Sequence, residues 1–181
     1  MAVVEAIATT YLEADASNIQ WDNIPDTYEH LEIRATLQAN HYSVAVGAGT
    51  LYLNETASGG NYYARHMLRG NKSVVNTNNS ATHNHASFFQ SRLLQEEYGL
   101  MHAWVLDYAN PNKLTTVQLN GGLPGGHTSR EPYVWFGQLL FWEDSGSDDA
   151  KDAVDWISLR NPGASFTRGS SATLYGWNSG N

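Results

Sequence analysis

The chain has 181 residues, which is the usual length of a single folded domain. Charged residues make up only 15% of the chain and aromatic residues 12%, so it can bury enough apolar surface to fold and is not intrinsically disordered. The formal net charge of -8 excludes a nucleic-acid groove, which needs a basic face. The absence of cysteine excludes disulfides and thiolate metal sites.

The first residues of the chain do not predict a targeting signal. Residues Met1–Thr10 lack the basic start and the long apolar core of a signal peptide. Nowhere does the sequence approach the roughly 18 uninterrupted apolar residues of a membrane span. We therefore expect synthesis in a cytoplasm and no membrane partner.

A period of two dominates the chain. Apolar and polar residues alternate between Tyr28 and Gln38, which is typical of a half-buried antiparallel strand. The apolar face consists of Leu31, Ile33, Ala35 and Leu37, and the polar face of Glu32, Arg34, Thr36 and Gln38. Similar segments are Val3–Leu12, Ser43–Asn54, Tyr62–Arg69, Met101–Tyr108, Lys113–Asn120, Tyr133–Trp142, Val154–Arg160 and Ala172–Trp177. With glycine- and proline-rich turns between them, they predict one all-β domain over residues 1–181, an antiparallel β-sandwich of about eight to ten strands.

Two segments depart from this period. In Ser87–Tyr98 the apolar residues stand near helical spacing, which predicts a short helix near residues 87–97, with a bent apolar loop over the core as the alternative. The segment Asp144–Asp152 is a polar, acidic connection between two strands.

The one metal-like motif is His83-Asn84-His85. On a strand both imidazoles share a face and can reach one ion, but two nitrogens do not complete a site unless a three-fold axis multiplies them. We expect a solvated or interface histidine pair and no metal or other cofactor. The acidic residues between Glu143 and Asp155 lack a calcium-loop register, so they predict a solvated loop.

No motif predicts catalysis. A Gly-x-Ser-x-Gly elbow and phosphate-binding glycine motifs are absent, and no carboxylate pair stands out, so we expect no catalytic residues and a protein that is not an enzyme. The aromatic residues leave a sugar site open, because aromatic faces stack on sugar rings. Core packing explains most of Trp104, Trp135, Trp142 and Trp156, which lie inside apolar strands. Surface candidates near strand ends are Trp21, Tyr62, Tyr63 and Trp177.

Several stretches, in order along nearly the whole chain, resemble the jelly-roll-type β-sandwich domain of structural proteins from tailed-bacteriophage virions. They are Ile7–Thr10, Ile24–Arg34, Leu53–Asn54, Gly60–Tyr62, Leu68–Gly70, Leu106–Lys113, Val154–Leu159, Phe166, Gly169–Ser170 and Leu174–Gly176. Within them, Asp107 and Asn110 are expected to bond local backbone N–H groups at a tight corner, and the last strand to pair beside the first. The chain departs from the group's pattern at Trp177, where an aliphatic residue is usual, and in longer segments over residues 78–100 and 144–152.

The resemblance implies a jelly-roll-like virion protein, made in the host bacterial cytoplasm. A lone sandwich without a fibre shaft favours a capsid decoration, or cement, protein that binds the major capsid protein or other virion subunits as a homotrimer. The alternative is a tail or fibre-tip domain that recognises a host-surface glycan.

Overall fold

Strands form all the regular secondary structure of the residues that the structure describes. The computed structural model describes residues 3–40, 47–54, 61–71, 74–80, 86–92, 98–113, 115–123, 133–143 and 153–179. The strands are β1 (Val3–Tyr11), β2 (Asn18–Trp21), β3 (His30–Ala39), β4 (Gly47–Leu53), β5 (Asn61–Asn71), β6 (Val74–Ser80), β7 (Ala86–Arg92), β8 (Gly99–Leu106), β9 (Thr115–Leu123), β10 (Tyr133–Glu143), β11 (Ile157–Arg160) and β12 (Ser171–Asn178).

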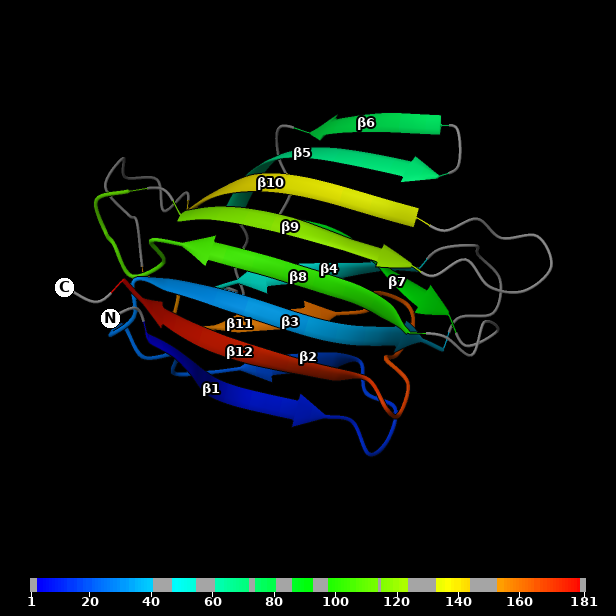
Figure 1. Cartoon of the computed structure of the whole chain (residues 1–181), viewed down its shortest axis with the longest axis horizontal. Helices are drawn as coiled ribbons and strands as arrows, with labels where there is room; N and C mark the ends of the chain where they lie inside the picture. Colours follow the sequence, from blue (N-terminus) through cyan, green and yellow to red (C-terminus); the bar gives the residue numbers. More distant parts are fainter. Residues whose placement is uncertain are drawn as a thin grey trace.

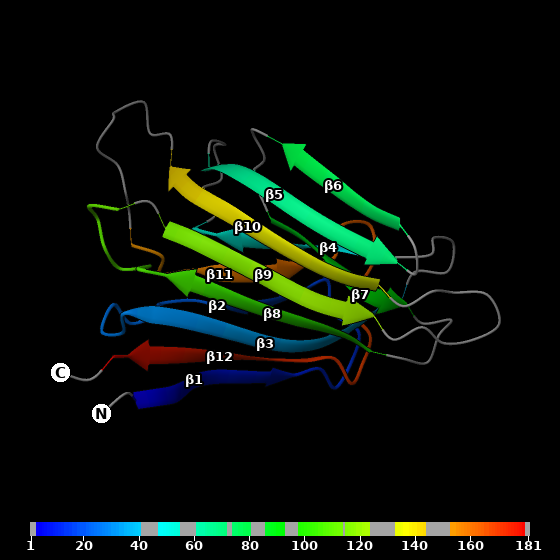
Figure 2. The ribbon, with the colours of Figure 1, turned by 45° about the horizontal axis from the view of Figure 1, so that its top comes forward.

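The strands are arranged in two layers (Figure 1). The large sheet has the order β1-β12-β3-β8-β9-β10-β5-β6, and every neighbouring pair in it is antiparallel. The small sheet, β2-β11-β4-β7, is also antiparallel and lies behind the large one in Figures 1 and 2. A short parallel contact between β3 and β7 joins the two layers. This arrangement confirms the predicted antiparallel β-sandwich.

The core lies between the two layers and follows the predicted alternation. Leu31, Ile33 and Leu37 of β3 are buried, as their shared face predicted. The facing small sheet contributes a second set of buried residues, Ile19, Leu51, Leu53, Ile157 and Leu159. Aliphatic side chains from both inner faces therefore fill the space between the sheets, as in other sandwiches.

Two of the turn predictions can be checked at the corner after β8. The side chain of Asn110 accepts a hydrogen bond from the backbone N–H of Asn112 at 2.9 Å, as predicted. The carboxylate of Asp107 instead binds Nζ of Lys113 at 2.9 Å. The backbone of Asp107 adopts a φ of 52°, a left-handed conformation that aspartate tolerates better than most residues.

The buried Tyr108 ties the same corner to the turn before β3. Its hydroxyl donates to the carbonyl of Pro25 and accepts a hydrogen bond from the N–H of Tyr28 at 3.4 Å. The ring of Tyr28 covers Gly176 on β12 so closely that a Cβ there would overlap the ring.

The last strand pairs beside the first, as predicted, over Val3–Tyr11 and Ser171–Asn178, with one irregularity between Ala6 and Ala8.

One prediction of secondary structure is wrong. Residues 86–92 form β7, a strand, and not the start of the helix predicted near residues 87–97; residues 93–97 lie outside the described part. The strand forms because Phe88 and Phe89 pair with Gly49 and Ala48 of β4, and such ladder contacts override a weak helical spacing. Three strands, β2, β6 and β7, add to those expected from the sequence.

Candidate functional site

The outward face of the large sheet carries the candidate site. Cross-strand register places Arg34 of β3 beside His102 of β8, His102 beside Asn120 of β9, and Asn120 beside Phe136 of β10. These four side chains form one row across four strands. A parallel row consists of Thr36, Leu100, Gly122 and Val134, and another of Glu32, Trp104, Gln118 and Gln138.

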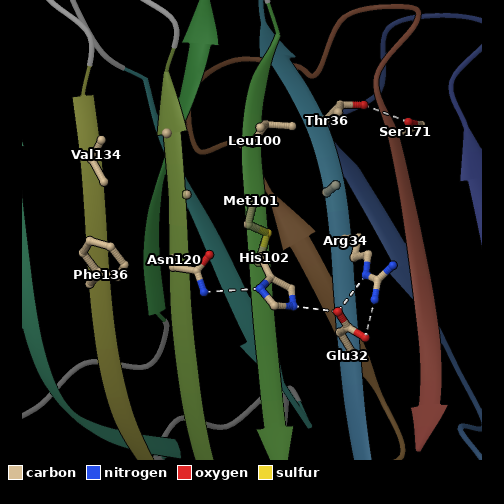
Figure 3. Close-up of a pocket in the computed structure, with 13 residues that line it drawn as sticks. Glu32, Arg34, Thr36, Leu100, Met101, His102, Asn120, Val134, Phe136 and Ser171 are labelled. Atoms are coloured by element: carbon tan, nitrogen blue, oxygen red, sulfur yellow. Dashed lines mark hydrogen bonds and ion pairs between the residues drawn. The ribbon is translucent and has the colours of Figure 1, made fainter. Parts of the chain in front are cut away.

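A groove runs over the first two of these rows and reaches Glu32 of the third. Its volume is about 660 Å³, within the range of about 300–1,000 Å³ that is usual for small-molecule sites. At one end Val134 and Phe136 of β10 present apolar side chains that are each more than half exposed, and Leu100 of β8 is a third exposed apolar side chain nearer the middle. At the other end lie Glu32 and Arg34, and His102 and Asn120 stand between the two ends (Figure 3). The groove is therefore apolar on one side and hydrogen-bonding on the other.

The polar end is organised by Glu32. This residue lies on the outward side of its strand, yet it is only 2% exposed because neighbouring side chains cover it. Oε1 accepts from Nε of Arg34 and from Nε2 of His102, each at 2.7 Å. Oε2 accepts from Nη2 of Arg34 at 3.1 Å and from Nε1 of Trp177 at 2.8 Å. All four bonds converge on one carboxylate, so Glu32 holds three other side chains in place.

These contacts determine the ionisation of Glu32. Burial raises its pKa, but the hydrogen bonds from Arg34, Trp177 and His102 outweigh burial, so the pKa lies below its ordinary value of 4.5. The charge of the ionised Glu32 is matched by that of Arg34. On the opposite side of His102, Nδ1 lies 3.3 Å from Nδ2 of Asn120, which extends the network toward Phe136 (Figure 3).

Aromatic side chains surround the polar end. The rings of Trp104 and Trp177 lie 5.0 Å apart between centroids, and Trp104 contacts His102 edge to face at 5.6 Å. The guanidinium of Arg34 lies 4.9 Å from the centre of the Tyr175 ring. The orientations of the tryptophans and of Arg34 are thus constrained by packing as well as by hydrogen bonds.

The structure redistributes the aromatic residues that the sequence singled out. Trp177 lies on the outward face, as predicted for a surface aromatic, and Trp135 is in the core, as its strand position predicted. Trp21 was predicted at the surface but is buried in the small-sheet side of the core. Trp104 is on the outward face rather than in the core, and half-buried, because alternation along β8 directs Met101, Ala103 and Val105 inward.

Most of the other residues that the sequence singled out lie outside the described part of the chain. His83 and His85 lie outside the described residues, as does the acidic segment 144–152, while Asp155 is exposed. Tyr62 and Tyr63 belong to β5 and Trp142 to β10, but their side chains are outside the described part.

The functional residues that sequence reasoning missed are Glu32, His102 and Asn120. Glu32 and Arg34 were assigned to a polar strand face, and the only local signal was that a carboxylate and a guanidinium share that face. His102 and Asn120 become visible only through register, since 70 residues separate His102 from Glu32 along the chain.

Outside this groove, the described residues hold a smaller hollow and no metal-binding cluster. The smaller hollow, of about 400 Å³, lies among Tyr28, Glu29, His30, Asp107, Ala109 and Asn110. Within the described ranges no group of three or more histidine or acidic side chains is placed to hold a metal ion. No helix in the described part of the chain is long and apolar enough to cross a membrane.

Comparisons with protein-family models, with curated proteins and with solved structures gave no match to this chain. Function is therefore inferred from the sequence resemblance, from the two-layer fold with its edge strands, and from the groove.

Proposed function

We propose that this chain is a non-enzymatic structural protein of a tailed-bacteriophage virion, and specifically a capsid decoration protein that binds the outer shell. The resemblance described above supports the virion setting. The structural observation that carries the proposal is the exposed edge strand β1, because such an edge suits contact with other protein subunits.

Strand β1 has nine residues and pairs only with β12 among the described strands. Val3 and Tyr11 are each more than half exposed, and Glu5 is the only charged residue of the strand. Edge strands of freely soluble proteins are usually protected by charges, by proline, by bulges or by being short, and of these β1 has only Glu5 and the one irregularity between Ala6 and Ala8. A long edge of low charge therefore favours a partner that covers it.

On a shell, such a protein would act by mass action. A domain that binds the assembled capsid and not its separated subunits stabilises the assembly by about 2.7 kcal/mol per site at a free concentration one hundred times Kd. A homotrimer seated at local three-fold points would bridge neighbouring capsomers, with the major capsid protein as its partner.

The test is binding of the purified protein to undecorated capsids of the phage that encodes it. We expect saturable co-sedimentation and a rise in capsid melting temperature. V3K, which places a charge on the β1 edge, should weaken binding at least tenfold. L100K makes the same kind of change at an equally exposed apolar residue away from this edge and should leave binding unchanged. Absence of saturable binding, together with an unchanged melting temperature, would refute the proposal.

A second candidate function is a tail or fibre-tip domain that recognises a host-surface glycan. The Trp104–Trp177 pair beside the Glu32 network favours it, because aromatic rings and fixed polar groups are the two elements of a sugar site. Immunolabelling of intact virions distinguishes the two candidates, since label on the head supports the first and label at the tail supports the second.

A further inference from the structure

We infer that the groove on the outward face of the large sheet binds a short, uncharged oligosaccharide. One pyranose ring stacks on Phe136 and its neighbour along the chain of sugars bonds to Asn120 and Arg34. For its biological role this inference rests on the second candidate function. The binding itself does not depend on where the protein sits on the virion.

The two sides of the groove match the two sides of a pyranose. A sugar ring has an apolar C–H face, and Val134 and Phe136 of β10 offer exposed apolar surface at one end of the groove. It also carries hydroxyl groups that both donate and accept hydrogen bonds. Figure 3 shows Asn120 and His102 lying between Phe136 and the pair of Glu32 and Arg34, so apolar and polar surface follow one another along one line.

Two residues that line the groove, Arg34 and Asn120, carry a donor and an acceptor. Arg34 uses Nε and Nη2 to bind Glu32, which leaves Nη1 as a donor without a partner among the described residues. Asn120 uses Nδ2 toward His102, which leaves its Oδ1 as an acceptor without a partner among the described residues. A hydroxyl-bearing ligand can satisfy both atoms, whereas a purely apolar ligand would bury them without compensation.

The balance of charge in the groove favours an uncharged ligand. The carboxylate of Glu32 and the guanidinium of Arg34 form one ion pair, so their charges cancel. An acidic sugar or a phosphate would need an excess of positive charge, as in sites built from several arginines. Among the described lining residues Arg34 is the only lysine or arginine, and its charge is already matched.

The sheet excludes an extended peptide as the preferred ligand. Peptides commonly add to a sheet edge through backbone hydrogen bonds, but β3, β8 and β9 each have a strand paired on both sides. Only side chains therefore point into the groove. The row from Arg34 to Phe136 spans three strand spacings, or about 14 Å, which is longer than one sugar ring. A short oligosaccharide fits this length better than a monosaccharide.

The side chains at the polar end of the groove are already ordered in the unliganded protein. Glu32 fixes Arg34, His102 and Trp177 in the unliganded protein, so binding has little side-chain entropy to remove at the polar end. For this reason Glu32 is a positioning residue, and Phe136, Asn120 and Arg34 are the residues that contact the sugar.

The experiment uses the full chain on an array of neutral and acidic oligosaccharides, followed by calorimetric titration with a neutral tetrasaccharide that gives signal and with its uronic-acid counterpart. We expect saturable binding of at least one neutral tetrasaccharide, and binding of the acidic one at least tenfold weaker. F136A and, independently, N120A should each weaken binding at least tenfold. Both residues lie on the outward face, and circular dichroism checks that the variants fold.

The matched control is Y11A, which removes an equally exposed aromatic side chain on β1, outside the groove. It should leave sugar affinity unchanged. No saturable signal from any neutral glycan, a preference for acidic glycans, or unchanged affinity in both F136A and N120A would overturn the inference. Capsid binding and virion labelling are measured separately from sugar binding. Either proposed function can therefore fail while sugar binding holds, and sugar binding can fail while a proposed function holds.

Discussion

The substitution Glu32→Gln tests whether the buried carboxylate organises the outward face of the large sheet. Glutamine has nearly the same shape as glutamate, so the change removes the charge and one acceptor without opening a cavity. If Oε1 is retained, it still accepts from Nε of Arg34 and Nε2 of His102. The new amide N–H₂ then faces Nη2 of Arg34 and Nε1 of Trp177, which are themselves donors.

The magnitude follows from the bonds that are lost. A hydrogen bond to a charged group contributes about 1.5–3 kcal/mol, and two of the four bonds on Glu32 cannot form in the variant. The side chain of Arg34 is 57% exposed, so water replaces part of what it loses, and the full sum is not reached. We therefore expect the free energy of unfolding to fall by about 2–3 kcal/mol.

Urea unfolding followed by tryptophan fluorescence measures this change. With an m-value of about 2 kcal/mol/M, the midpoint should fall by roughly 1–1.5 M while m stays constant. Glu13→Gln is the matched control, because Glu13 is 79% exposed and its contact with Arg168 is 3.8 Å long. Its effect should stay below about 0.5 kcal/mol. If the two variants lose equal stability, water screens the Glu32 network and the reasoning about the site is wrong.

Three further predictions concern pH, the Tyr108 corner and the close approach at Gly176. Because the pKa of Glu32 is lowered in the folded state, its contribution to stability is present above pH 4.5 and is lost as the pH falls through the folded pKa; the stability gap between wild type and Glu32→Gln should therefore narrow in urea titrations below pH 4.5 and stay constant above it. Tyr108→Phe removes the hydroxyl that donates to the Pro25 carbonyl, and should cost about 1–2 kcal/mol, or roughly 2–6 °C in Tm by calorimetry; an unchanged Tm would contradict this. Gly176→Ala places a Cβ against the ring of Tyr28 and should cost about 1–3 kcal/mol by urea unfolding, whereas a stability equal to wild type would show that the ring can move aside.

The alternation of apolar and polar residues was sufficient by itself to predict the class of fold. Alternation along β3 predicted which of its side chains, Leu31, Ile33 and Leu37 among them, enter the core, and the structure confirms it. The pairing of the last strand beside the first was also predicted. The first of these predictions follows from a period of two that is written along a single strand, so no knowledge of neighbouring strands was needed. The second came from the stretches that carry the resemblance and not from alternation.

Pattern was insufficient wherever a residue's environment depends on its neighbours in space. Residues 86–92 form a strand because β4 lies beside them, although their apolar spacing suggested a helix. Trp21 lies in the core and Trp104 on the outer face, opposite to what their positions near strand ends and strand centres had suggested. Side-chain alternation assigns the two faces of a strand, but the fold decides which face is covered.

The candidate site was decided by tertiary structure alone. Composition and alternation determined that this is an all-β sandwich of low charge, and they placed Glu32 and Arg34 on the polar face of one strand. The packing of β3 between β8 and β12 brought His102 and Trp177, which lie 70 and 145 residues from Glu32, onto the same carboxylate. Strand order is a non-local choice, made by the closure of loops and by the fit of whole sheets. For that reason the sequence contains the groove's residues without revealing that they meet.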